Sequence, residues 1–387
     1  MSARETRGGS ATSEPPVSQS SDSQPRVTKT SRLGRMLGKY IDRFDRPDPI
    51  SFGAAFESVE RVLVIPESGV AGALFAVPTL RAMRRGFPQG KIAVLVRDED
   101  KELLEGSVEV DRVIGYSLPR GMKRVSTFMT LAKRLKSYRF DIAILLDRES
   151  DFERIYLCYM TGAKIRAGLQ GDESHPFLNL EVSRRVSGST RAQLGLQIAS
   201  VMGIDVTGLG LMWEVPEQER RTAEQLIHFR KPREDELLIG FDPGPGRGGT
   251  SVSTAQQAKL LDQLCADYNA RAILLTSTDH HEHAKKLESM LSREPIFVQQ
   301  RRTRDVVSLL GQCDLFVAGN TDLVYFAIAL GIPTVSMMTA GELEAEAYPD
   351  RDYLEIITLV PGDRFPIEEF MERTQSAMLR GASEEGG

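Results

Sequence analysis

The stretch LFVAGNTDLVYFAIALGIPTV, residues 315–335, decides the fold of this chain. It begins with an apolar run typical of a buried strand, passes through the polar turn Gly-Asn-Thr-Asp, and continues into an Ala-rich segment that favours a helix. Gly331 ends that helix and Pro333 opens another strand. A polar turn before a helix N-terminus gathers free backbone N–H groups and the positive end of a helix dipole, which suits phosphate. An ordinary strand-to-helix turn of an α/β domain has the same spacing, so both interpretations stay open.

Similar apolar runs alternate with helix-like segments along the rest of the chain, in two series. The first series comprises Val62–Ile65, the run from Lys91, Arg112–Tyr116 and Asp141–Leu146; the second begins at Leu237, Ala272, Pro295, Leu315 and Pro333. This alternation indicates βαβ units and parallel sheets. We therefore predict an α/β protein with two Rossmann-like parallel-sheet domains facing across a cleft. The predicted units are residues 59–215, a charged linker region at 216–235, residues 236–365, and a C-terminal helix and tail at 366–387.

The N-terminal residues 1–58 are predicted to form a disordered tail followed by a basic amphipathic helix. Residues 1–30 contain too few large apolar side chains to offset the entropy lost on ordering. Between Arg26 and Arg46 there are seven basic and two acidic residues, and apolar residues recur at helical spacing. Two interpretations of residues 32–46 remain: peripheral contact with an anionic membrane surface, or packing on the folded domain.

Bulk composition narrows the class of protein. The chain has 387 residues, 41% of them hydrophobic and 27% charged, as expected of a soluble globule large enough for two cores. A net charge of −5 argues against a general nucleic-acid partner. There is no run of about 18 apolar residues and no apolar signal-peptide core, so we expect a cytoplasmic protein.

The cysteine and histidine residues predict no metal and no cofactor. Three cysteines lie far apart in apolar, helix-like settings, which indicates buried thiols rather than disulfides or metal ligands: Cys158, Cys265 and Cys313. The neighbouring His280, His281 and His283 have no accompanying cysteine or carboxylate pattern. We interpret them as the exposed start of a helix.

Three segments carry a resemblance to one family. They are VLVIPESGVAGALFAVPTLRAMRRGFP from Val62, FDPGPGRGGTSVS from Phe241, and the stretch from Leu315. Together they resemble the ADP-heptose:lipopolysaccharide heptosyltransferases, glycosyltransferase family nine, over residues 61–360. The resemblance implies a GT-B fold in which the first domain receives the acceptor and the second binds a nucleotide-diphosphate sugar. It also implies inverting, metal-independent transfer to a cell-envelope glycan or lipopolysaccharide-type acceptor.

The family's polar residues align with different residue types in this chain. The family base, an Asp, falls on Gly72, and its phosphate-binding Lys falls on Thr250. Only Thr321 is retained from the polar turn of the second domain. The glycine-rich loop still allows close backbone approach to a pyrophosphate, and Arg247 supplies a cation. The predicted nucleotide-sugar site is Gly244, Gly246, Arg247, Thr250, Asn320, Thr321 and Asp322.

Two carboxylates are candidates for the missing base. Glu67 and Asp147 each follow a predicted parallel strand, at the edge of the sheet where ligands bind. The alternatives are a solvated loop carboxylate for Glu67 and a helix-capping or ion-paired role for Asp147. Asp322 is expected to cap the helix that follows it, although a carboxylate there repels a diphosphate.

A basic stretch, Arg120–Arg139, has apolar residues at helical spacing, including Val125 and Met129. It predicts an amphipathic surface helix; the alternative is a docking face for an anionic glycolipid acceptor or its membrane. The function predicted for the whole chain is glycosyl transfer. The alternatives are a catalytically inactive GT-B pseudoenzyme that binds a glycan, a nucleotide or a protein and, as a third choice, a sugar-nucleotide epimerase.

Overall fold

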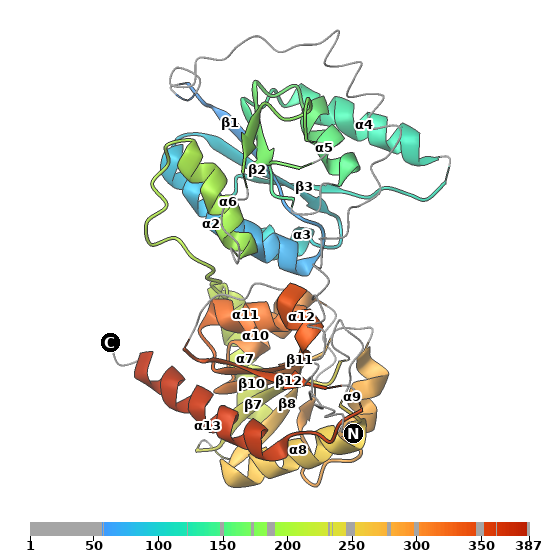
Figure 1. Ribbon diagram of the computed structural model, residues 1–387, viewed down its shortest axis with the longest axis vertical. Helices are drawn as coiled ribbons and strands as arrows, with labels where there is room; N and C mark the ends of the chain where they lie inside the picture. The colour runs from blue at the N-terminus through green and yellow to red at the C-terminus, as the bar shows by residue number, and fades with distance from the viewer. Residues whose placement is uncertain are drawn as a thin grey trace, which may run out of the picture.

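The protein has two α/β domains, each built on a six-stranded parallel sheet (Figure 1). The computed structural model describes residues 56, 58–121, 123–147, 151–171, 174–183, 190–230, 233, 235–244, 252–276, 280–297, 302–345, 352–360 and 362–384. Most of the predicted N-terminal tail, including residues 32–46, lies outside the described residues. The predicted α/β class with two parallel-sheet domains is confirmed.

The sheet of the first domain has the order β3-β2-β1-β4-β5-β6. Its central strands are buried on both faces, which explains why they read as continuous apolar runs rather than alternating patterns. In chain order the elements are β1 (Arg61–Ile65), α2 (Val70–Gly86), β2 (Lys91–Arg97), α3 (Lys101–Leu104), β3 (Arg112–Tyr116), α4 (Lys123–Ser137), β4 (Ile142–Leu145), α5 (Phe152–Met160), β5 (Ile165–Leu169), β6 (Leu180–Val182) and α6 (Arg191–Val201).

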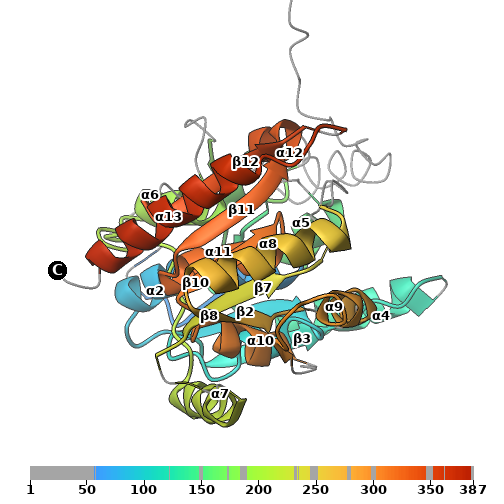
Figure 2. The ribbon, with the colours of Figure 1, turned by 90° about the horizontal axis from the view of Figure 1, so that it is seen from below.

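The second domain repeats this plan with the strand order β12-β11-β10-β7-β8-β9. Helices α10 and α11 lie between its sheet and the first domain, whereas α8 and α13 cover the opposite face (Figures 1 and 2). Its elements are α7 (Glu217–Arg230), β7 (Leu237–Asp242), α8 (Thr254–Asp267), β8 (Ala270–Leu274), α9 (His281–Glu288), β9 (Ile296–Phe297), α10 (Thr303–Leu310), β10 (Leu315–Gly319), α11 (Asp322–Leu330), β11 (Thr334–Thr339), α12 (Ala340–Ala345), β12 (Leu354–Leu359) and α13 (Ile367–Glu384).

Helix α11 ends where the sequence predicted. Gly331 adopts the left-handed conformation, with a φ of 77°, that a residue with a side chain rarely takes. Its N–H and that of Ile332 bond back to the last carbonyl groups of the helix. The chain can therefore turn directly into β11, which pairs with β10 in parallel register.

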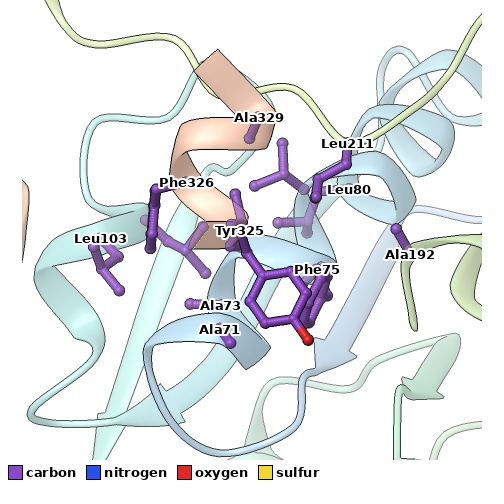
Figure 3. Packing of buried hydrophobic residues seen from close by; sticks show 14 of the residues in the cluster. Ala71, Ala73, Phe75, Leu80, Leu103, Ala192, Leu211, Tyr325, Phe326 and Ala329 are labelled. Atoms are coloured by element: carbon purple, nitrogen blue, oxygen red, sulfur yellow. The ribbon is translucent and has the colours of Figure 1, made fainter. Parts of the chain in front are cut away.

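An apolar contact joins the two domains where α11 crosses α2 (Figure 3). The ring of Tyr325 on α11 is 1% exposed and packs edge-on against Phe75 on α2, with 4.8 Å between the ring centroids. Trp213, on the segment between the domains, packs in the same way against Phe326. Buried residues of both domains therefore form one continuous hydrophobic cluster.

Polar contacts join the domains a short distance from this cluster. The guanidinium of Arg304 on α10 donates to the backbone oxygens of Glu102 and Glu105 in the first domain, and also forms an ion pair with Glu219 on α7. The region predicted as a linker, residues 216–235, contains α7, which packs against α10.

The basic stretch Arg120–Arg139 forms α4, a helix with one buried and one exposed face. The buried face comprises Phe128, Leu131, Ala132 and Leu135. Two residues that the sequence placed in the apolar stripe face solvent instead, because the helix rests on the sheet by its other side. They are Val125, which is 71% exposed, and Met129, which is 39% exposed.

Candidate active site

The strand order of the second sheet produces a topological switch point at its carboxyl edge, the type of position at which parallel sheets form a ligand-binding crevice. After β7 the chain continues to β8 on one side, whereas β10 pairs with β7 on the other. Ala318 of β10 lies opposite Asp242 of β7 in this pairing. The loop after β7 and the turn after β10 therefore lie side by side at the carboxyl edge of the sheet. Parallel sheets bind ligands at this type of topological switch point.

Asp242 is the buried charged group of this crevice. Its side chain ends β7 with 5% exposure, and one carboxyl oxygen accepts the backbone N–H of Gly244 at 2.9 Å. Burial raises the pKa of Asp242, although the Gly244 N–H, the Thr321 hydroxyl and the two histidines His280 and His283 act in the opposite direction. A buried carboxyl group with a raised pKa at such a sheet edge makes Asp242 a candidate functional residue.

A side chain at Gly244 would require its neighbours to move. A Cβ atom there would lie 2.7 Å from Nδ1 of His280 and 3.0 Å from the Asp242 carboxylate. The loop backbone therefore passes directly against the imidazole of His280. His283, one turn along α9, lies 3.3 Å from the Gln257 amide oxygen, and Gln257 in turn donates to the Pro243 carbonyl. The helix start predicted for the histidines is confirmed, with His280 at the cap position of α9, but their side chains are half-buried rather than exposed.

The polar turn after β10 begins with a buried, hydrogen-bonded asparagine. Asn320 is 2% exposed, and its amide donates to Glu342 at 3.4 Å. Thr321 occupies the cap position of α11, without a side-chain capping bond, and Asp322 is the first residue of the helix. The expectation that Asp322 caps α11 was wrong, because the chain enters the helix one residue earlier. Its charge is still favourable at the positive end of the helix.

Three of the predicted nucleotide-site residues cannot be placed. Gly246, Arg247 and Thr250 belong to residues 245–251, which lie outside the described residues. Their roles remain predictions. The described part of the candidate site consists of Gly244 after β7 and the turn at residues 320–322, and the start of α9 lies beside Gly244.

Glu67 lies at the corresponding edge of the first sheet, in the loop between β1 and α2. Its carboxylate forms an ion pair with Arg191 at 3.4 Å, and the Arg191 guanidinium lies over the ring of Phe75, 5.3 Å from the centroid. A cavity of about 20 Å³ borders these three residues. Because Phe75 also packs against Tyr325, a chain of contacts runs from Glu67 to the second domain.

Gly72 of α2, where the family resemblance predicted the base, lies directly against this same loop. A Cβ atom at Gly72 would lie 2.1 Å from the carbonyl oxygen of Glu67 and 3.1 Å from the Cβ of Glu67. An aspartate therefore cannot replace Gly72 unless the loop moves.

Asp147 is buried and forms an ion pair. Its side chain is 1% exposed, pairs with Arg154 at 3.1 Å and accepts the backbone N–H of Asp151 ahead of α5. Arg154 also donates to the carbonyl of Pro66, so this pair ties α5 to the loop after β1. These contacts match the ion-paired alternative for Asp147.

Two residues of this region, Arg191 and His280, were not predicted from the sequence as site residues. Arg191 begins α6, and 124 positions separate it from Glu67. His280 belongs to a cluster that the sequence explained as a helix start. Neither stands in a recognisable motif, so only the fold brings them to the two sheet edges.

Other features of the described residues lie away from these edges. A pocket of about 320 Å³ opens beside the interdomain segment, around Arg81, Trp213 and Arg304, and includes none of the predicted site residues.

Cys158 and Cys313 are buried and Cys265 is half-buried; burial raises the pKa of Cys158 to about 12 and that of Cys265 to about 11. Within the described ranges, no three His, Cys, Asp or Glu side chains are grouped to hold a metal ion. None of the described helices combines the length and apolar character needed to cross a bilayer.

Comparison with known proteins identifies the family. The pattern of glycosyltransferase family 9 (heptosyltransferase) matches residues 128–345, more than half of the chain. The chain belongs to glycosyltransferase family 9. Lipopolysaccharide heptosyltransferase 2 of Salmonella typhimurium is 21% identical over 72% of this chain and 82% of its own length. The family membership makes the protein a heptosyltransferase-like glycosyltransferase, and these comparisons give no support to an inactive scaffold.

Solved structures agree on the fold of this family 9 member. A family 9 glycosyltransferase from Veillonella parvula superimposes with a TM-score of 0.70 at 15% identity, covering 83% of this chain and 97% of the other. The ADP-heptose lipopolysaccharide heptosyltransferase II of E. coli gives a TM-score of 0.65 at 19% identity, covering 83% and 99%. The predicted GT-B fold is confirmed.

Proposed function

We propose that the protein transfers a sugar from a nucleotide-diphosphate donor to an anionic cell-envelope acceptor, with Glu67 as the catalytic base. The position of Glu67 carries this proposal. Its Cβ lies 3.1 Å from the point where a side chain at residue 72, the family's base position, would begin. A carboxylate side chain of the neighbouring loop thus begins beside the position predicted for the base. Arg191, paired with Glu67 and held against Phe75, orients the carboxylate.

The proposed reaction is a single displacement that inverts the anomeric centre. Glu67 removes the proton of the acceptor hydroxyl while its oxygen forms a bond to the anomeric carbon. The bond from that carbon to the diphosphate breaks on the opposite face. Backbone N–H groups at the start of α11 and in the glycine-rich loop stabilise the departing negative charge, together with Arg247. In this mechanism no metal is required.

We propose an anionic glycolipid as acceptor, reached at the inner face of the cytoplasmic membrane. Support comes from the exposed face of α4, which carries Lys133 and Lys136 together with Val125 and Met129. Basic side chains attract anionic headgroups, and exposed apolar side chains gain by entering the lipid boundary. Residues 32–46 would add a second basic contact on the same membrane.

Replacement of Glu67 tests the proposal directly. Transfer from ADP-heptose, the donor named for the E. coli structural relative, is the first reaction to measure. Glu67→Gln should lower kcat by about 10²–10⁴-fold, because the amide cannot accept the proton. Glu368→Gln on α13 is the matched control, since that side chain is exposed and distant. Thermal unfolding should show that both variants remain folded.

Two results would decide against this assignment. Turnover by Glu67→Gln at the wild-type rate would show that the base lies elsewhere. Absence of transfer and of thermal stabilisation with every nucleotide-diphosphate sugar would remove the donor proposal. A ligand at a hundred times its Kd should stabilise the fold by about 2.7 kcal/mol, which is readily detected.

A further inference from the structure

The pocket at the junction of the two domains has no part in the proposed reaction. Its volume of about 320 Å³ is at the lower end of the roughly 300–1,000 Å³ typical of small-molecule sites, which occur preferentially at domain interfaces. Its lining comes from α2, from residues 103–109, from residues 212–217 and from Arg304 of α10. A ligand in this pocket therefore contacts both domains and the segment that joins them.

Large apolar side chains contribute to the walls of the pocket. Trp213 lines it and packs edge-on against Phe326, with 5.2 Å between the ring centroids. Val108 and Met212 also belong to the lining, and they are 88% and 49% exposed. Exposed apolar side chains are stabilised when an apolar group covers them. The pocket therefore favours a ligand with an apolar body.

Acidic side chains outnumber basic ones in the lining. The lining side chains that carry charge are Arg81, Arg304, Glu105, Glu109, Glu214 and Glu217. Four carboxylates against two guanidinium groups leave an excess of two negative charges. Arg81 already pairs with Glu109 and Glu214, at 3.0 and 3.1 Å, and Arg304 pairs with Glu219 at 3.0 Å. The charge of the pocket therefore favours a cation.

The described charges just outside the lining do not alter this balance. Lys101 pairs with Glu105, and Arg220 and Arg221 pair with Glu217. Three further carboxylates of the same region match these three cations in number. They are Glu102, Glu219 and Glu224, which contact Thr303, Arg304 and Arg220.

The same ion pairs and hydrogen bonds fix the shape of the pocket. The side chains of Arg81 and Arg304 are only 19% and 13% exposed. The Arg304 guanidinium donates to the backbone oxygens of Glu102 and Glu105, at 2.9 and 2.7 Å, and so ties α10 to the end of α3. A pocket that is formed before its ligand arrives loses little conformational entropy on binding.

We propose that this interdomain pocket is a second ligand site, which binds a small organic cation with an apolar body. The lining carboxylates and the indole of Trp213 attract the positive charge, since aromatic rings attract cations. The apolar body covers Val108 and Met212. Because the ligand contacts both domains, its binding stabilises the contact between them. This site is independent of the proposed transfer reaction.

Titration of the full chain with three matched probes tests the proposal, with the fluorescence of Trp213 as the signal, because this is the single tryptophan of the chain. At neutral pH phenethylammonium is cationic, 2-phenylethanol is neutral and 3-phenylpropionate is anionic, and each carries a phenyl group. Phenethylammonium should bind with a Kd about tenfold lower than that of 2-phenylethanol, the scale of one charge-assisted hydrogen bond. 3-Phenylpropionate should bind most weakly. Equal affinity for the cation and the alcohol, or no saturable binding of phenethylammonium below about 10 mM, would overturn the proposal.

A double variant locates the binding in this pocket. Glu105→Gln with Glu214→Gln removes two exposed lining carboxylates and keeps the size of both side chains. It should weaken phenethylammonium binding about fivefold, the scale of two partly screened charge interactions, and leave 2-phenylethanol binding unchanged. Glu368→Gln with Glu372→Gln is the matched control, because it makes the same change of charge on exposed positions of α13 outside the pocket. An equal loss in both double variants would show a general effect of charge and overturn the assignment to the pocket.

Discussion

At the scale of single residues, Asp242 shows how this chain retains an unfavourable group at its crevice. The carboxyl group is 5% exposed, and burial raises its pKa above the ordinary value. The folded state then binds the proton more tightly than the unfolded state, so stability falls as pH rises from the ordinary pKa to the raised one. Above the raised pKa, the Asp242 carboxylate is charged in both states, and the full cost of burying that charge remains. A cost of this kind at the edge where parallel sheets bind ligands makes Asp242 a candidate functional residue.

The substitution Asp242→Asn removes this penalty and keeps an oxygen for the Gly244 N–H. We expect the variant to be more stable than wild type at neutral pH, by an amount of order 1 kcal/mol. The difference should vanish near pH 3, where the aspartate is protonated in both states. Urea unfolding at several pH values measures it, with Asp363→Asn on an exposed turn as control. A variant that is less stable at pH 7 would show that the charged form is favoured.

At the scale of secondary structure, the sequence predicted the elements that are continuous and apolar and missed those that polar residues interrupt. All nine strands expected from apolar runs are present. Strand β5 was missed because Arg166 breaks its pattern; the guanidinium is buried and bonds to the carbonyls of Phe177 and Ala163. Strand β12 was missed for the same reason, because Glu355 interrupts its apolar run. In the folded chain Glu355 forms an ion pair with Arg373 of α13. Only the folded chain supplies the partners that make these polar residues compatible with a sheet.

Helix α4 leads to a prediction about the membrane. The double variant Val125→Glu with Met129→Glu adds two acids to the exposed basic face and leaves the buried face of the helix unchanged. Binding to vesicles rich in anionic phosphatidylglycerol should fall about tenfold or more in a co-sedimentation assay, since both the apolar and the electrostatic attraction weaken. Leu379→Glu on α13, a comparably exposed apolar position at 67%, is the control. Equal loss in the control would contradict a specific role for α4.

At the scale of the whole molecule, the sequence indicated which sheet edges would carry the site but not what each edge contains. The β7–β10 pairing follows from the order of βαβ units, and it places the glycine loop beside the polar turn. By contrast, Arg191 reaches Glu67 across 124 positions. Tyr325 is buried between the domains, where it packs against Phe75. Such outcomes depend on tertiary packing that no local pattern records.

The contact between Phe75 and Tyr325 predicts that the two domains unfold together. Their rings lie within one hydrophobic cluster that spans both sheets, so separating the domains exposes buried core. Trp213, the single tryptophan of the chain, packs against Phe326 at this contact, so its fluorescence reports on the interface. In wild type, fluorescence and circular dichroism should follow the same denaturant curve.

Phe75→Ala should separate the two signals, with the Trp213 fluorescence changing at lower denaturant than the circular dichroism. Loss of a buried aromatic ring costs about 3–5 kcal/mol, here taken from the contact between domains. Phe370→Ala is the matched control, because that ring is fully buried within the second domain alone. It should lower the midpoint while the two curves stay coincident. Separate curves in the wild type would contradict cooperative unfolding, and the interface would then be a contact between independently stable domains.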